Sequence, residues 1–126
     1  MKQILMARGA QTLVDTCTNV KAGEKVVIVT DMTKVTIAEA VATAAYERGA
    51  EVVMTVMEPR KRAGQEPPEP VAAAMKTADV IFSPVSFSIT HTQAVKDAVS
   101  GGARAIVMTD FTEGMMMGGG IEANFQ

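Results

Sequence analysis

The chain has 126 residues, a formal net charge of −2 and a pI near 5.4, with one cysteine and one histidine. Its length fits one domain with its own core, its acidic balance argues against nucleic acid as the main partner, and its single cysteine excludes an internal disulfide framework. No apolar run has the length of a membrane span, and the start lacks the features of a signal peptide. We therefore expect a cytoplasmic protein that binds neither nucleic acid nor membrane.

The first half of the chain alternates between helical and strand patterns. Residues 1–20 predict an amphipathic helix, with apolar side chains at helical spacings at Ile4, Leu5, Leu13 and Val14. Residues 25–30 form a short β-branched run, which is typical of a strand buried on both faces. A second helix is expected from Thr36, because Thr36 and Glu39 have the spacing of a capping box. Its buried face is predicted to contain Ile37, Val41, Ala44 and Ala45.

The second half repeats this alternation. We expect, in order, a strand at Glu51–Met57, a polar proline-rich loop at 58–70, a helix at 71–77, a strand at 79–85, a helix at 92–99 and a strand from Arg104. The stretches "ERGAEVVMT" and "SGGARAIVMT" form a weak internal repeat in which a helix ends at a glycine and a strand follows. Gly49 is well placed as the residue just past its helix.

Strands separated by helical segments of this length pair in parallel through right-handed crossovers. We therefore predict a Rossmann-like, three-layer αβα fold with a four-stranded parallel sheet in the order 2-1-3-4. A further helix would have barely begun at Gln126. We expect 1–126 to be a single α/β domain at the N-terminus of a longer two-domain protein.

The candidate functional surface is the edge of the sheet at the carboxyl ends of the strands, where ligands bind in open parallel sheets. Three loops with hydroxyl and carboxylate groups leave this edge, namely "TDMTK", "SPVSFSITHT" and "TDFTEG". The residues expected to face a cleft or contact substrate there are Asp31, Ser86, Ser88, Thr90, His91, Thr92 and Glu113.

No established catalytic or phosphate-binding motif accompanies these residues. One histidine and one cysteine argue against a metal site within the domain, and the Gly118–Gly120 run favours a hinge or linker over a phosphate loop. His91 lies beside a predicted helix start, with Thr90 or Thr92 as the N-cap. Capping or local structure, contact with substrate, and direct catalysis all stay open for His91, with the structural role favoured. We assign no catalytic residue.

The stretch "SITHTQAVKDAVSGGARAIVMTDFTEGMM" resembles the N-terminal domain of the thermophilic metallo-aminopeptidases, the leucyl aminopeptidase-like aminopeptidase T and S type. The residues that carry this resemblance are Ser88, His91, Thr92, Ala94, Gly102, Ala103, Arg104, Met108, Thr112 and Glu113. "GEKVVIVTD" and "ERGAEVV" are also similar to that family, and the architecture is similar to that of 2,5-dihydroxypyridine dioxygenases.

The resemblance implies that the catalytic half of the protein lies elsewhere. In these aminopeptidases, two divalent metal ions and their ligands belong to a C-terminal domain, and this domain would wall the cleft that receives the peptide substrate. Its partners would be its own C-terminal catalytic domain, the peptide and, as an open question, further copies in a homo-oligomer. Two alternatives remain: the corresponding half of an iron-dependent, ring-cleaving dihydroxypyridine dioxygenase, or a free-standing small-ligand-binding domain.

Overall fold

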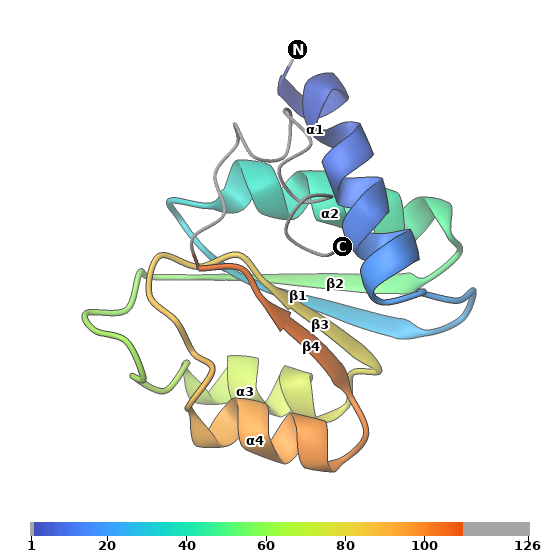
Figure 1. Ribbon diagram of the computed structural model, residues 1–126. Coiled ribbons are helices and arrows are strands. Elements are labelled where there is room, and N and C mark those ends of the chain that lie inside the picture. The colour runs from blue at the N-terminus through green and yellow to red at the C-terminus, as the bar shows by residue number, and fades with distance from the viewer. Residues whose placement is uncertain (1, 110–126) are drawn as a thin grey trace.

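Helical segments and strands alternate along residues 2–109, which are the residues that the computed structural model describes (Figure 1). In chain order they are α1 (Lys2–Gln11), η1 (Thr12–Cys17), β1 (Lys25–Asp31), α2 (Val35–Glu47), β2 (Glu51–Met57), α3 (Glu69–Lys76), β3 (Val80–Ser83), α4 (Gln93–Ser100) and β4 (Arg104–Val107). The segment η1 is a short stretch of π-helix that continues α1.

All strand pairs within residues 2–109 are parallel, and the sheet has the order β2-β1-β3-β4. The register aligns Lys25 with Glu51 across β1 and β2, and Val26 with Val80 across β1 and β3. The predicted fold class and strand order are therefore confirmed. The order follows from right-handed crossovers, which place β2 on one side of β1 and the later strands on the other.

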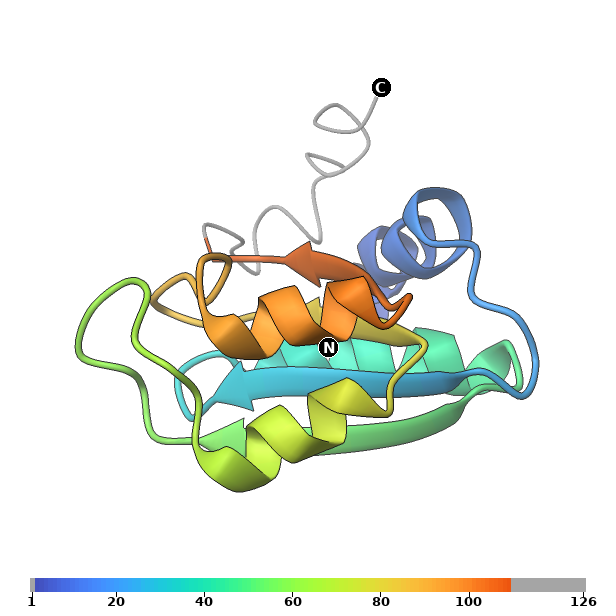
Figure 2. The ribbon, with the colours of Figure 1, turned by 90° about the horizontal axis from the view of Figure 1, so that it is seen from below.

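Two layers of helices enclose this sheet (Figures 1 and 2). The segments α1, η1 and α2 cover one face, while α3 and α4 cover the other. Because successive strand residues point to opposite faces, Val26 and Ile28 of β1 pack with the first layer, and Val27 and Val29 pack with the second. Strand β1 is thus buried on both faces, as its continuous β-branched run predicts.

The first helix differs from its prediction in both length and buried face. It ends at Cys17, because the Thr18 hydroxyl donates hydrogen bonds to the carbonyl oxygens of Leu13 and Val14 at 3.0 and 3.1 Å. Leu13 and Val14 are buried as expected, whereas the two predicted apolar positions near the start, Ile4 and Leu5, are exposed. Met6 and Ala10 are buried in their place.

The second helix begins one residue before the predicted capping box. Its N-cap is Lys34, so Thr36 lies within the first turn and the capping-box prediction is wrong. The backbone N–H of Lys34 donates to the Asp31 carbonyl at 3.0 Å, which closes a tight turn directly after β1 and starts the helix early. The predicted buried face of α2 is confirmed at all four of its positions.

Both glycines of the internal repeat terminate helices in the same way. Gly49 and Gly102 have φ values of 85° and 104°, in the region that favours glycine. In each case the following residue, Ala50 or Ala103, donates its N–H back to the carbonyl five residues earlier, at 3.3 and 3.1 Å. This is the Schellman arrangement, and it confirms Gly49 as the residue just past its helix.

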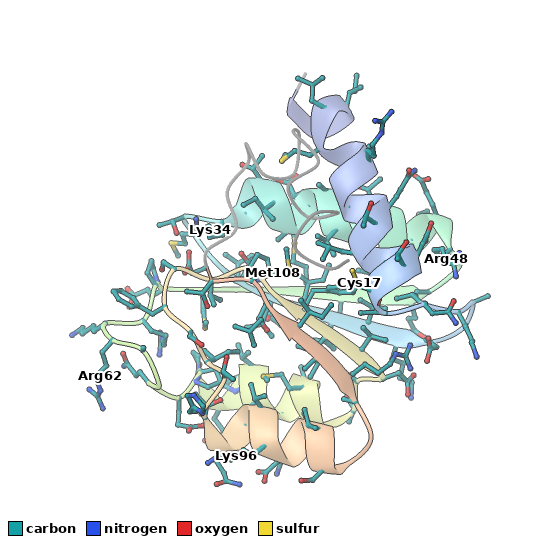
Figure 3. All side chains as sticks on the ribbon, viewed as in Figure 1. Cys17, Lys34, Arg48, Arg62, Lys96 and Met108 are labelled. Atoms are coloured by element: carbon teal, nitrogen blue, oxygen red, sulfur yellow. The ribbon has the colours of Figure 1, made fainter. Side chains whose placement is uncertain are left out.

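The third helix begins earlier than predicted, at Glu69, and has Pro70 in its first turn. Proline is tolerated there because the first N–H groups of a helix have no partner within it. The loop before it, 58–68, has no regular structure, as its prolines indicate. Arg62 in this loop is exposed and points away from the body of the molecule (Figure 3), as expected of the predicted polar loop.

Candidate functional site

The carboxyl ends of the parallel strands lie along one edge of the sheet, and the loops 32–34, 58–68 and 84–92 gather there (Figure 2). We call these loops and Asp31 the rim. Figure 3 shows Lys34 on this side of the molecule. The rim brings Asp31 and the hydroxyl-rich stretch after β3 together, as the sequence predicts, and it adds the loop 58–68, which the sequence did not assign to the site.

Asp31 holds two of the rim loops together. One carboxylate oxygen, Oδ1, accepts hydrogen bonds from the Thr33 N–H at 2.9 Å and the Thr33 hydroxyl at 2.5 Å. The other, Oδ2, accepts from the Ser86 N–H at 2.7 Å and the Ser86 hydroxyl at 2.6 Å. The residue is only 1% exposed. Asp31 and Ser86 are therefore joined to each other instead of presenting free groups to a ligand.

The ionisation of Asp31 follows from these contacts. Burial acts to raise the pKa of the carboxyl group, but the hydrogen bonds from Ser86 and Thr33 outweigh it, and the pKa is lower than that of an ordinary aspartate. A carboxylate held in its charged form by several donors is a poor general acid near neutral pH. We interpret Asp31 as a structural residue that fixes the shape of the rim.

A second contact ties the same two segments. The Thr30 side chain is fully buried and donates from its hydroxyl to the Pro84 carbonyl at 2.8 Å. The end of β1 is thus joined to the loop after β3 through two successive residues, Thr30 and Asp31. The first half of the loop 84–92 is therefore anchored on the sheet.

The second half of this loop is ordered by its own hydroxyl groups. The Ser88 and Thr90 hydroxyls lie 2.8 Å apart, and the Thr90 N–H donates to the Ser88 hydroxyl at 3.2 Å. Thr92 is buried and its hydroxyl accepts from the Val95 N–H at 3.3 Å. Of the two predicted N-caps, Thr92 is therefore confirmed as the N-cap of α4, and Thr90 is not.

Glu66 is a rim residue that the sequence analysis missed. From the loop 58–68, its carboxylate accepts the backbone N–H groups of Gln93 at 2.7 Å and Ala94 at 3.2 Å, at the start of α4. A negative charge at a helix N-terminus is favourable because the unpaired N–H groups and the helix dipole are positive there. Gly64 of the same loop donates its N–H to the Ser88 carbonyl at 2.9 Å. The loop 58–68 is therefore held at two points, against the start of α4 and against the loop 84–92.

Replacing Glu66 with alanine is expected to destabilise the protein by about 1 kcal/mol, because two N–H groups at the start of α4 lose their acceptor. Amide hydrogen exchange should quicken at Gln93 and Ala94, and chemical denaturation should give the free energy. Glu58→Ala removes an exposed carboxylate from the same loop and is the matched control. Equal exchange rates at the start of α4 in both variants would contradict this role for Glu66.

His91 lies on the exposed part of the rim, between Thr90 and the buried Thr92. Within residues 2–109, no hydrogen bond or ion pair engages its side chain. A serine nucleophile with a histidine base needs the two groups within hydrogen-bond reach and an acid to orient the imidazole. The described residues do not supply this arrangement around His91. Glu113 and the Gly118–Gly120 run lie outside the described residues.

A groove of about 350 Å³ lies between α1 and α2, away from the rim. It is lined by Ile4, Ala7, Gln11, Glu39, Ala40, Thr43, Ala44 and Glu47. None of these residues belongs to the rim. Cys17 is half-buried and packs against the core beneath α1 and α2, and this burial raises the pKa of its thiol.

Comparison with protein families shows which family the chain belongs to. The family model for the thermophilic metalloprotease (M29) matches residues 2–66, just over half of the chain. The chain belongs to the M29 family. The matched region contains the predicted family-like segments "GEKVVIVTD" and "ERGAEVV", whereas "SITHTQAVKDAVSGGARAIVMTDFTEGMM" lies beyond it. No curated protein matches the chain significantly.

A solved structure shares the fold of this M29 chain. It is 2,5-dihydroxypyridine dioxygenase from Pseudomonas putida KT2440, with a TM-score of 0.67 and 11% sequence identity. The match covers 83% of this chain and 34% of the dioxygenase chain, so the M29 chain spans about a third of that protein. At this identity the likeness shows a common fold, as the resemblance to that group of enzymes implies.

The name of the M29 family implies a metal ion. Within residues 2–109, no group of three or more His, Cys, Asp or Glu residues is placed to hold one. Asp31, the carboxylate at the end of β1, already uses both of its oxygens. The described residues therefore do not fit a metal centre by themselves. No helix among them is both long and apolar enough to cross a membrane.

Proposed function

We propose that the chain is the N-terminal, non-catalytic domain of a longer metal-dependent aminopeptidase, and that its rim walls the active-site cleft. The match to the M29 family over residues 2–66 is the observation that carries this proposal. The small share of the dioxygenase chain that this chain covers supports a second domain, because 83% of this chain matches only 34% of that protein with the same fold. The second domain would bind the metal ions.

The composition of the rim suits contact with a peptide. Beside the exposed Thr90 and His91, it presents two exposed apolar side chains, Met32 at the start of one loop and Phe87 in another. Hydroxyl and imidazole groups can hydrogen-bond to a peptide backbone, and apolar side chains can receive its apolar side chains. The contacts of Asp31 and Glu66 hold this surface in one shape, which reduces the entropy lost when a substrate binds.

The chemistry would belong to the second domain. Two divalent metal ions bound there would polarise the scissile carbonyl group and supply the attacking hydroxide. The residues described here would orient the peptide and help to exclude water from the cleft. We place the enzyme in the cytoplasm, because its single cysteine suits a reducing compartment.

The substrate class can be tested on the longer protein that contains this chain. Loaded with divalent metal, it should release the amine from aminoacyl anilides and should leave 2,5-dihydroxypyridine unchanged. Ring cleavage without anilide hydrolysis would instead support the dioxygenase alternative, which at present has only the shared fold in its favour. If both activities were absent and the 126-residue chain bound a small molecule specifically, the result would support a free-standing binding domain.

Replacing His91 with asparagine is expected to change kcat/KM of the longer enzyme by no more than a few-fold. His91 lacks a partner with which to act as a base within the described residues, and asparagine retains a hydrogen-bonding group at the same place. Steady-state kinetics on an aminoacyl anilide would measure this. A loss of about a hundredfold, which corresponds to about 2.7 kcal/mol of transition-state stabilisation, would contradict a peripheral role for His91.

A further inference from the structure

Within the part of the chain that the structure describes, strand β2 is an edge of the sheet, and about half of its backbone groups have no hydrogen-bond partner there. It pairs with β1 on one side and is the last strand of the sheet on the other (Figure 2). The Glu51 N–H donates to Glu24, and the Met57 carbonyl accepts from Met32, so the odd-numbered residues of β2 direct their backbone groups toward β1. Since backbone direction alternates along a strand, the N–H and C=O groups of Val52, Met54 and Val56 point to the open edge.

This edge lacks the usual protection against pairing. Exposed edge strands commonly carry a lysine, a proline or a bulge that prevents another strand from adding to them. Strand β2 reads "EVVMTVM" and has neither lysine nor proline, and its register with β1 is continuous over all seven positions. Its side chains Val53, Met54 and Val56 are 49, 38 and 45% exposed. Apolar side chains thus flank a row of unpaired backbone groups. This combination favours the pairing of another strand with β2.

From this pattern we infer that β2 is an interface between two copies of the chain, which pair their β2 strands antiparallel about Met54. A two-fold axis normal to the sheet would join the two sheets into one continuous sheet and keep equivalent helical layers on the same side. The outward groups of Val52, Met54 and Val56 would then meet those of Val56, Met54 and Val52 in the second copy. Each such pair exchanges two hydrogen bonds.

The side chains of β2 match their own copies in this register. Val52 faces Val56, and Val53 faces Thr55, which are β-branched pairs that stabilise antiparallel sheets. The one charged residue, Glu51, faces Met57, and the two Glu51 carboxylates lie at opposite ends of the paired strands, about 20 Å apart. No like charges oppose each other. A partner with the same sequence therefore satisfies every position, as an isologous two-fold interface requires.

Sedimentation velocity of the 126-residue chain tests this interface. We expect a concentration-dependent dimer that Val53→Lys abolishes, because two lysines would lie diagonally across the paired strands. Val99→Lys is the matched control: Val99 is also 49% exposed but lies on α4, and its variant should dimerise like the wild type. A monomer at every concentration, or a dimer that survives Val53→Lys, would overturn the inference.

A cysteine series tests the register and does not depend on the folding of the lysine variant. In a Cys17→Ser background, Met54→Cys should form an intermolecular disulfide on mild oxidation, because the two Cα atoms of a hydrogen-bonded pair lie about 5.5 Å apart, within disulfide range. Val52→Cys should not, since its partner is Val56. The same rate of cross-linking at positions 52 and 54, or none at position 54, would refute pairing about Met54.

Discussion

Replacing Asp31 with alanine is expected to lower the free energy of unfolding by about 3 kcal/mol or more. The substitution leaves the N–H groups of Thr33 and Ser86 without the buried carboxylate that accepts from them, and it disconnects the loop 84–92 from the end of β1. Breaking a buried, charged hydrogen-bond network of this kind is among the most destabilising single changes. Denaturation with urea, monitored by circular dichroism, would measure the loss.

The matched control for this change is Asp97→Ala. Asp97 is an exposed aspartate whose carboxylate accepts one hydrogen bond, from the Gln93 side chain at 2.7 Å, on the surface of α4. Its removal should cost at most about 0.5 kcal/mol. If Asp31→Ala and Asp97→Ala had the same effect on stability, Asp31 would not be the residue that fixes the rim.

The low pKa of Asp31 also predicts how stability depends on pH. Burial acts to raise this pKa, but the hydrogen bonds from Ser86 and Thr33 lower it by a larger amount. The folded protein therefore holds the proton less tightly than the unfolded chain does. The stabilisation is therefore complete above the unfolded pKa, near 3.9 for a free aspartate, and is lost as the pH falls through the folded value. Below about pH 4, the free energy of unfolding should fall less steeply with pH in Asp31→Asn than in the wild type. Equal slopes would contradict this.

Replacing Phe82 with alanine is expected to cost about 3–5 kcal/mol, a large fraction of the roughly 5–15 kcal/mol by which an ordinary protein is stable. Phe82 is fully buried in β3, where it packs with the core beneath α1 and α2, and it aligns with Ile28 in the neighbouring strand. Its removal leaves a cavity that the rigid sheet cannot close. Thermal or chemical denaturation would show the loss.

Phe87→Ala is the control for the core substitution. It removes the same side chain from the rim, where Phe87 is 42% exposed, and should change stability by less than about 1 kcal/mol. Since Phe87 lies on the proposed cleft wall, its removal should instead weaken substrate binding in the proposed longer enzyme. A loss of stability as large as that of Phe82→Ala would show that the loop 84–92 is part of the core.

The fold could be predicted from the sequence because its signals are local. The β-branched run of β1 and the glycines after α2 and α4 set where strands and helices begin or end, and crossover handedness then determines the strand order. The helix starts were less predictable. The turn held by Asp31 started α2 before the expected capping box, since a tight turn after the strand competed with the Thr36 signal.

The rim was predictable as a location but not as a set of contacts. Parallel strands place Asp31 and the loop after β3 at one edge, so the region could be named from the sequence. The pairing of Asp31 with Ser86, 55 positions apart, and that of Glu66 with the start of α4 depend on how the loops pack in three dimensions. No local pattern encodes these contacts. Most of the predicted hydroxyl groups therefore prove to order the loop, and Thr90 and His91 remain as exposed candidates for contact with substrate.

The most direct test of the proposed function compares the 126-residue chain with the longer protein that we propose contains it. Both would be purified, supplied with divalent metal and assayed on an aminoacyl anilide, with folding of the short chain checked by circular dichroism. We expect the folded short chain to be inactive, and the longer protein to be active and to lose its activity when a chelator removes the metal. Metal-dependent hydrolysis by the short chain alone would contradict a non-catalytic domain.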